Sequence, residues 1–218
     1  MEIMCNNMQS DINIQNIISV FQEMNQYFTS SLKIIWPTVG SRGFTESNMV
    51  QSFLFYCKSK FNAIIYSEVP FLYRSRIDGL AFIDFNQSAH ILLIEAKRVK
   101  ENQYNSAYFG IGRDTNRMLE TDRIINILER IIKKDIISVT VQPIFLADVW
   151  VGNKNRSEEV KAKWESKNEQ DSLFFGWETK FSDAIWRSES GKVKYHQMLA
   201  IGGAKYFYKN NENKWDIK

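Results

Sequence analysis

The sequence predicts an α/β protein in which helices cover both faces of a central mixed β-sheet. Segments with helical spacing of apolar residues precede and interrupt the segments that are typical of strands. The central strands are apolar on both faces: Ile77, Ala81 and Ile83 lie on one side, and Leu80 and Phe82 lie on the other. A sheet with two apolar faces is buried on both sides, so we expect helices on each.

The composition is that of a folded globular chain. It has 218 residues, of which 44% are hydrophobic and 14% aromatic, enough for a sizeable core. We find no repeat, low-complexity segment or proline-rich linker in the sequence. We therefore expect a single domain over residues 1–218, with a core at about 44–150. An N-terminal helical extension and a C-terminal strand-rich extension flank that core.

The sequence also restricts compartment and function class. Cys5 and Cys57 have no metal-ligand spacing, and we expect free thiols in a reducing cytoplasm. We see neither a signal peptide nor an apolar run of membrane-spanning length, so we expect a cytoplasmic protein with no membrane partner. Walker-type loops, dinucleotide fingerprints and nucleophile elbows are absent from the sequence, which argues against nucleotide hydrolases, dehydrogenases and esterases. The formal net charge of +3 permits a polyanionic partner without requiring one.

Periodicity and capping indicate the elements in chain order. Asp11–Leu32 has a largely helical spacing, and Thr45 is typical of the cap of a second helix. Asp114–Lys134 has the clearest helical stripe, with acids early and lysines at its end. The charged stretch 153–172 is expected to be a solvated helix or loop. The predicted strands are Ala63–Val69, Arg76–Phe85, His90–Ala96, Ile136–Trp150, Leu173–Trp177 and Val193–Tyr208.

Charged residues stand inside two of the most apolar strands, where an uncompensated charge would be costly. If Arg76–Phe85 and His90–Ala96 form an antiparallel hairpin, a two-residue loop places Asp78 opposite Glu95. A loop two residues longer places Asp78 opposite Lys97, and an intermediate register sends it to the other face. Glu95 and Lys97 are two residues apart and share a face. Two registers therefore gather all three side chains at one end of the hairpin.

Two carboxylates and an ammonium at one strand end can support phosphodiester chemistry. Asp78 and Glu95 can hold a hard divalent cation such as Mg²⁺, and the Ala96 carbonyl is an additional candidate ligand. Lys97 can orient a bound water, help deprotonate it, or stabilise charge that develops on phosphate. The plain alternative is a partly exposed ion pair between Glu95 and Lys97.

Ile77-Asp78, the apolar hairpin and Glu95-Ala96-Lys97 resemble the PD-(D/E)xK nuclease superfamily, which has the restriction endonuclease-like fold. The resemblance covers roughly Phe44–Trp150, in the order helix, strand, Asp-bearing strand, ExK strand, helix and strand. Ile77 stands where the motif's name has proline. One branch of the superfamily has a Gln-x-x-x-Tyr element on the following helix. Here Gln103 and Tyr108 are one residue too far apart for that element.

The resemblance implies a role for each motif residue. Asp78 and Glu95 would bind Mg²⁺ or Mn²⁺, and Lys97 would serve the nucleophilic water. An acid on the helix before the sheet would support the site, and Glu46 is the best match. Glu68 is the second candidate for that acid. The alternatives are a helix-capping acid at Glu46 and a structural acid at Glu68.

Nucleic acid is the partner that these residues predict. Four basic residues could meet phosphates: Arg98, Lys100, Arg113 and Arg117. A solvated strand exit and a charged helix face explain them equally well. The leading hypothesis is a Mg²⁺-dependent deoxyribonuclease in a restriction, defence or repair setting. The alternatives are a catalytically inactive nucleic-acid- or protein-binding module of the same fold, and a structural partner that assembles into an oligomer such as a homodimer.

Overall fold

Two capped helices come first in the described part of the chain. The computed structural model describes residues 12–34, 45–70, 76–100, 113–132, 135–151, 154–166, 174, 176–188 and 194–218. Helix α1 (Ile14–Ser31) begins after Asn13, whose side chain accepts the N–H of Asn16. Helix α2 (Glu46–Phe61) begins after Thr45, whose side chain accepts the N–H of Asn48, as predicted. No helix in the described ranges combines the length and apolar character that crossing a lipid bilayer demands.

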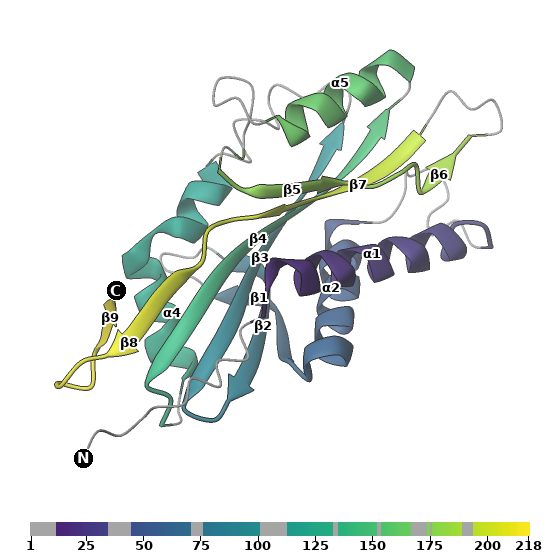
Figure 1. Cartoon of the computed structure of the whole chain (residues 1–218). Helices are drawn as coiled ribbons and strands as arrows, with labels where there is room; N and C mark the ends of the chain where they lie inside the picture. Colours follow the sequence, from purple (N-terminus) through teal and green to yellow (C-terminus); the bar gives the residue numbers. More distant parts are fainter. Residues whose placement is uncertain are drawn as a thin grey trace.

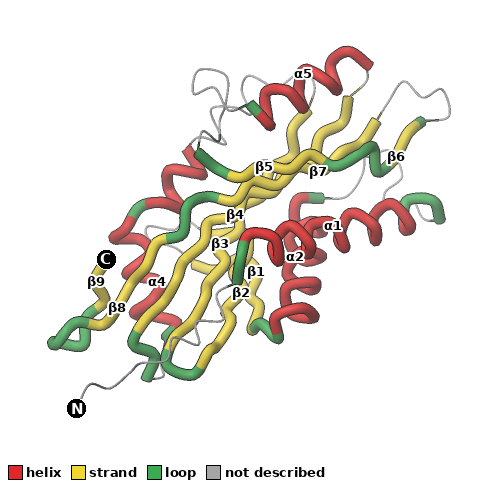
Figure 2. The backbone as a smooth tube through the Cα atoms, viewed as in Figure 1, coloured by secondary structure: helices red, strands yellow, loops and turns green. Residues whose placement is uncertain are grey.

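A nine-stranded sheet forms the centre of the molecule (Figures 1 and 2). Its hydrogen-bonded path runs β1-β2-β3-β4-β7-β5; β6 pairs with β7, and β8 lies between β4 and β9. All pairs are antiparallel except β3 with β4. The sheet is therefore mixed and mostly antiparallel. The strands are β1 (Ile64–Pro70), β2 (Arg76–Phe85), β3 (Ser88–Lys100), β4 (Ser138–Val151), β5 (Glu178–Phe181), β6 (Trp186–Arg187), β7 (Lys194–Ile201), β8 (Lys205–Lys209) and β9 (Trp215–Ile217).

Helices cover both faces of this sheet, which confirms the predicted α/β layering. Along β4, Ile144 and Leu146 pack into one core with α1 and α2, whereas Phe145 and Ala147 point the opposite way. The opposite face is covered by α4 (Thr121–Ile131) and α5 (Lys154–Glu165), which contribute to two further clusters. Figure 1 shows α1 and α2 together on one side of the sheet and α4 on the other.

The β2–β3 hairpin closes through a two-residue turn, the shortest of the loop lengths considered from the sequence. Asn86 and Gln87 form the turn, and Asn86 has a φ of 70°, a conformation that asparagine tolerates in tight hairpin turns. The paired residues run from Phe85 with Ser88 to Gly79 with Ile94. The first of the three registers considered from the sequence is therefore correct.

Between β3 and β4, the described residues form two helical segments where the sequence predicted one. Residues 113–119 are helical, and α4 begins at Thr121. Glu120 between them has a ψ of 113°, which is incompatible with a continuous helix. The predicted helix Asp114–Lys134 is thus interrupted, although its stripe is confirmed by burial of Met118 and Leu128.

Two C-terminal predictions need correction. The predicted strand Leu173–Trp177 is wrong, because described residues 174, 176 and 177 lie in turns or bends and pairing starts at Glu178. Gly176, with a φ of 78°, provides the turn conformation that favours glycine. The predicted strand Val193–Tyr208 is two strands, β7 and β8. The break lies opposite Pro143 of β4, which has no N–H for the ladder, and the Gly202 N–H donates to the Pro143 carbonyl at 3.0 Å.

Candidate active site

Asp78 and Glu95 lie side by side where β2 stops pairing with β3. The register, continued one pair beyond Gly79 and Ile94, places Asp78 directly opposite Glu95. The Asp78 Oδ2 accepts the backbone N–H of Ala96 at 2.8 Å. A residue in an antiparallel strand directs its N–H and C=O to the same neighbour, so the Ala96 carbonyl lies on this edge too. The structure therefore brings both predicted acids and the predicted carbonyl to one strand end.

Glu46 reaches the next amide along the same edge. Its Oε1 accepts the backbone N–H of Arg98 at 2.6 Å. Helix α2 can lie this close because β2 has a glycine beneath it. A Cβ at Gly79 would lie 2.8 Å from Val50 Cγ1 of α2. Beyond the hairpin, β2 no longer accepts hydrogen bonds from the β3 backbone. The carboxylates of Asp78 and Glu46 accept them instead, from the N–H groups of Ala96 and Arg98.

Lys97 points to the α4 side of the sheet and meets an acid that the motif did not include. Its Nζ lies 2.9 Å from Asp114 Oδ2, at the start of helical segment 113–119. Burial lowers the pKa of Lys97, but Asp114, Glu46 and Glu95 outweigh it, and the pKa is raised overall. Lys97 is therefore held as an ammonium. The sequence showed Asp114 only as an acid in a first helical turn, with no spacing that linked it to Lys97.

Glu95 is the most strongly perturbed acid of this group. It is 2% exposed, and burial together with the nearby Asp78 carboxylate raises its pKa to about 8. Arg117 opposes that rise through an ion pair in which its Nη2 contacts Glu95 Oε1. The Arg117 Nη2 also lies 3.7 Å from Asp114 Oδ1. We call these residues the acid–cation cluster: Asp78, Glu95, Lys97, Asp114 and Arg117.

The other predicted site residues have different surroundings. Arg113 is exposed over 82% of its side chain and approaches Asp114 Oδ1 at 3.9 Å. The Lys100 side chain lies outside the described residues. Glu68 pairs with Arg76 at 2.6 Å, with both side chains more than half exposed. Of the two acids considered as support for the site, only Glu46 bonds to the ExK strand among the described contacts.

Arg98 points to the opposite face of the sheet and belongs to a second polar group. Its Nε lies 3.4 Å from Asp148 Oδ2 on β4, and Gln197 of β7 is the register partner of Asp148. The Gln197 amide donates to the Tyr195 hydroxyl at 3.0 Å. We call Arg98, Asp148, Gln197 and Tyr195 the polar row. Asp148 stands inside the apolar run IFLADVW. An acid within an apolar strand is the same sequence pattern that singled out Asp78 and Glu95, so this pattern could have indicated the polar row.

The Asp78–Glu95 pair fits a divalent cation, whereas a larger ligand cage is not preformed. Two adjacent carboxylates repel each other, and the raised pKa of Glu95 reports that repulsion together with burial. A divalent cation relieves exactly this excess of negative charge, and carboxylate and carbonyl oxygens are suitable ligands. Within the described ranges, no group of three or more histidine, cysteine, aspartate or glutamate side chains is arranged to hold a metal ion.

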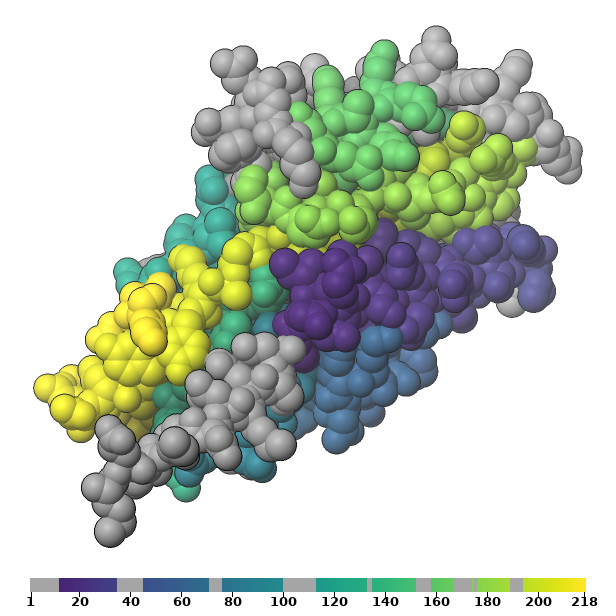
Figure 3. Space-filling view, viewed as in Figure 1, coloured from purple at the N-terminus to yellow at the C-terminus, as the bar shows by residue number. Residues whose placement is uncertain are grey.

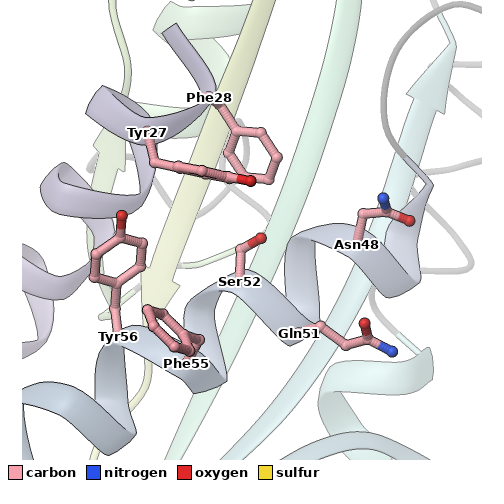
Figure 4. Close-up of a pocket in the computed structure, with 7 residues that line it drawn as sticks. All are labelled: Tyr27, Phe28, Asn48, Gln51, Ser52, Phe55 and Tyr56. Carbon is pink, nitrogen blue, oxygen red and sulfur yellow. The ribbon is translucent and has the colours of Figure 1, made fainter. Parts of the chain in front are cut away.

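Two hollows lie around α1, on the other face of the sheet. One, of about 390 Å³, lies between α1 and α2, where Tyr27 and Phe28 face Ser52, Phe55 and Tyr56 (Figure 4). The other, of about 690 Å³, is lined by α1 and residues 180–185, where α1 lies against the 178–187 segment in Figure 3. Neither hollow brings two carboxylates together among its lining residues. The acid–cation cluster therefore remains the candidate active site.

No protein-family model, curated protein or solved structure matches this chain. The likeness to the PD-(D/E)xK superfamily consequently stands on Asp78, Glu95 and Lys97 and on the order of the elements around them. What the site does has to be inferred from its chemistry.

Proposed function

We propose that the protein is a metal-dependent nuclease of the restriction endonuclease-like fold that hydrolyses phosphodiester bonds in DNA. The observation that carries the proposal is the convergence of Asp78 and Glu95 at one strand end, with Lys97 on the same face. The order α2-β1-β2-β3-helix-β4 supports it, because β1 to β3 form an antiparallel meander and β4 returns in parallel to β3. A restriction, defence or repair setting follows from the resemblance.

The two acids and the Ala96 carbonyl would hold Mg²⁺ or Mn²⁺. When bound, such an ion polarises a phosphodiester and lowers the pKa of water. Asp78 is oriented for this task by the Ala96 N–H, which fixes one of its oxygens. Glu95 is held in the sheet by β4, where Phe145 is its register partner.

Lys97 would act mainly by electrostatic interaction with the water and the phosphate. Asp114 and the neighbouring acids favour the ammonium form, which can orient a water or stabilise negative charge that develops on the phosphate. Proton abstraction would first require loss of that proton, so the ion pair favours an electrostatic role. Asp114 is a positioning residue for the Lys97 amine.

Glu46 would act through the backbone. Its bond to the Arg98 N–H ties the first turn of α2 to the strand that carries Glu95 and Lys97. The proximity of Glu46 also contributes to the raised pKa of Lys97. A carboxylate in this place positions the ExK strand and adds negative charge beside it.

An inactive binding module of the same fold is the alternative. The observation that favours it is that Arg117 and Lys97 already pair with acids of the cluster. Ion pairs that neutralise buried acids can be structural. Salt-sensitive DNA binding without cleavage would identify this alternative.

The deciding experiment is cleavage of plasmid and single-stranded DNA with Mg²⁺ or Mn²⁺ and with a chelator. We expect Asp78→Ala and Lys97→Ala to lower the rate by at least about 100-fold, as for loss of a group that stabilises transition-state charge. Arg130→Gln, which removes an exposed charge from α4, is the matched control and should cut like wild type. Metal-dependent cutting by both site variants at the wild-type rate would refute the proposal.

A further inference from the structure

We propose that Arg117 is a built-in counter-cation of the acid–cation cluster, which a divalent cation displaces from Glu95 when it binds. The inference rests on the proposed function, because it takes Asp78 and Glu95 as the residues that hold the metal ion. It gives Arg117 a role at the metal site in addition to the phosphate contact expected from the sequence.

The Arg117 guanidinium is surrounded by the kinds of oxygen that a metal ion needs. Its Nη2 contacts Glu95 Oε1, lies 3.7 Å from Asp114 Oδ1 and lies 3.4 Å from the carbonyl oxygen of Arg76. Carboxylate and carbonyl oxygens are also the ligands that Mg²⁺ prefers. The guanidinium and a metal ion therefore compete for the same oxygen of Glu95.

The charge balance of the cluster matches an exchange of cations. Three carboxyl groups of the cluster (Asp78, Glu95 and Asp114) face its two basic side chains (Lys97 and Arg117), while Arg113, which is 82% exposed, approaches Asp114 only from outside at 3.9 Å. With all three carboxyls ionised, movement of Arg117 away would leave three carboxylates against one ammonium within the cluster, an excess that a single divalent cation compensates. Loss of Arg117 without replacement would leave Glu95, which is 2% exposed, beside Asp78 with no nearby guanidinium.

The Arg117 side chain is only partly enclosed and does not use all its hydrogen-bond donors, as expected of a group that can be exchanged. Its Nε is buried and makes no hydrogen bond to any described residue, so the ion pair with Glu95 leaves one donor of the guanidinium unused. The Arg117 side chain is 24% exposed, compared with 3% for that of Glu95. A long side chain with one end near solvent can leave by rotation about its own bonds, without movement of the backbone.

Release of Arg117 would couple metal binding to substrate binding. The displaced guanidinium remains on helical segment 113–119 beside the site, where it can pair with a phosphate. Metal ion and phosphate each favour the released side chain, so each should increase the affinity for the other.

The test is the affinity of the full chain for Mn²⁺, measured by isothermal titration calorimetry at low ionic strength. We expect Arg117→Gln to bind Mn²⁺ about tenfold more tightly than wild type, a coupling of ordinary size between two sites. Arg130→Gln removes the same charge from a neighbouring helix and should bind like wild type. Asp78→Asn in the Arg117→Gln background should abolish the tight binding, which assigns it to this cluster.

Each outcome decides a different point. Equal or weaker affinity of Arg117→Gln, with clear binding to wild type, would overturn the exchange and leave the metal site of the proposed function intact. Absence of binding to both proteins would overturn the exchange together with that metal site. If Arg117→Gln does not fold, NMR of ¹⁵N-arginine-labelled wild type replaces it. Saturating Mg²⁺ should then shift the Arg117 Nε–H signal and not that of Arg130, and an unshifted Arg117 signal with bound Mg²⁺ would refute the exchange.

Discussion

Lys97 and Arg98 are adjacent on β3, yet they belong to two charged groups with opposite character. Lys97 lies in the acid–cation cluster on the α4 face, where acids outnumber the basic side chains. Arg98 lies in the polar row on the α1 face, where one arginine meets one aspartate and two neutral side chains. The basic side chains are partly exposed in both groups, over 35% for Lys97, 24% for Arg117 and 23% for Arg98. In the polar row, Gln197 and Tyr195 are fully buried.

The difference separates a site that can exchange charge from one that holds the sheet together. An acid-rich group at a strand end can accept a cation from solvent. A group with one acid and one base is balanced in charge, and the polar row links three neighbouring strands, β3, β4 and β7. Functional groups commonly cost stability, whereas structural groups contribute to it. The two groups should therefore respond differently to removal of an acid.

The largest expected effect is the loss of Asp148. Asp148→Ala should lower the free energy of unfolding by about 3 kcal/mol, because it leaves Arg98 without its partner in a mostly buried place. Glu95→Gln should cost about 1 kcal/mol or less, because it also removes repulsion with Asp78. Urea unfolding at neutral pH measures both.

A double variant controls for the cavity and the isolated charge. Replacement of both partners of the pair, in Arg98→Met with Asp148→Leu, should recover most of the stability lost in Asp148→Ala, because well-packed apolar residues often replace a buried ion pair without loss. A cost for Glu95→Gln equal to that of Asp148→Ala would contradict the distinction between the two groups.

The next effect concerns the glycine that lets α2 approach the sheet. Gly79→Ala places a methyl group 2.8 Å from Val50 Cγ1 and 3.2 Å from Leu54 Cδ1. We expect a loss of about 2 kcal/mol in the free energy of unfolding, the typical cost of overpacking. Displacement of α2 should also weaken the Glu46 bond to Arg98, so the cleavage rate should fall further than stability alone explains. Gly203→Ala is the control, because nothing lies within 4 Å of its added methyl group.

The polar row also predicts a pH dependence of stability. Burial raises the pKa of Asp148 to about 7, against the opposing effect of Arg98 and with a contribution from Glu46. A raised pKa means that the folded state binds the proton more tightly, so this stabilisation is complete below the unfolded pKa and is lost as pH rises through about 7. Between about pH 5 and pH 7 we expect a decline on the order of 1 kcal/mol or more.

Asp148→Asn isolates that contribution. Asparagine resembles the protonated acid and cannot titrate, so the decline in the free energy of unfolding over this pH range should become smaller, and Glu95, whose pKa is about 8, supplies part of the remainder. Arg98 faces Asp148 directly, and Gln197 and Tyr195 complete its surroundings. An unchanged pH profile in Asp148→Asn would assign the decline to other groups.

The sequence left three hairpin registers open, and the structure shows that the turn alone decides among them. Once Asn86 and Gln87 form a two-residue turn, the pairing of the two strands is fixed residue by residue. Asp78 then lies opposite Glu95. Thr45 predicted the start of α2, and hence the position of Glu46, from capping alone.

The partners across the sheet could not be predicted from the sequence. Asp114 reaches Lys97 because helical segment 113–119 lies on the α4 face, and no spacing in the sequence encodes that placement. Arg98 was expected near phosphates, but strand alternation sends it to the face opposite Lys97, where Asp148 pairs with it. That alternation was available in the sequence. The identity of the partner on β4 was not, because it depends on the register of a parallel strand pair whose partners are 50 residues apart in the sequence.

The smallest expected effect separates the two acids that were candidates for support of the site. Glu68 and Arg76 form an exposed pair, so Glu68→Gln should change the free energy of unfolding by less than about 0.5 kcal/mol. It should also leave DNA cleavage unchanged, because the Glu68 carboxylate makes no described contact with the acid–cation cluster. Glu46→Gln loses the charge beside Lys97 and weakens the bond to the Arg98 N–H. Its cleavage rate should therefore fall while Glu68→Gln stays at the wild-type rate. The reverse result would mean that β1 rather than α2 supplies the supporting acid, and that the α2 contact with β3 serves folding alone.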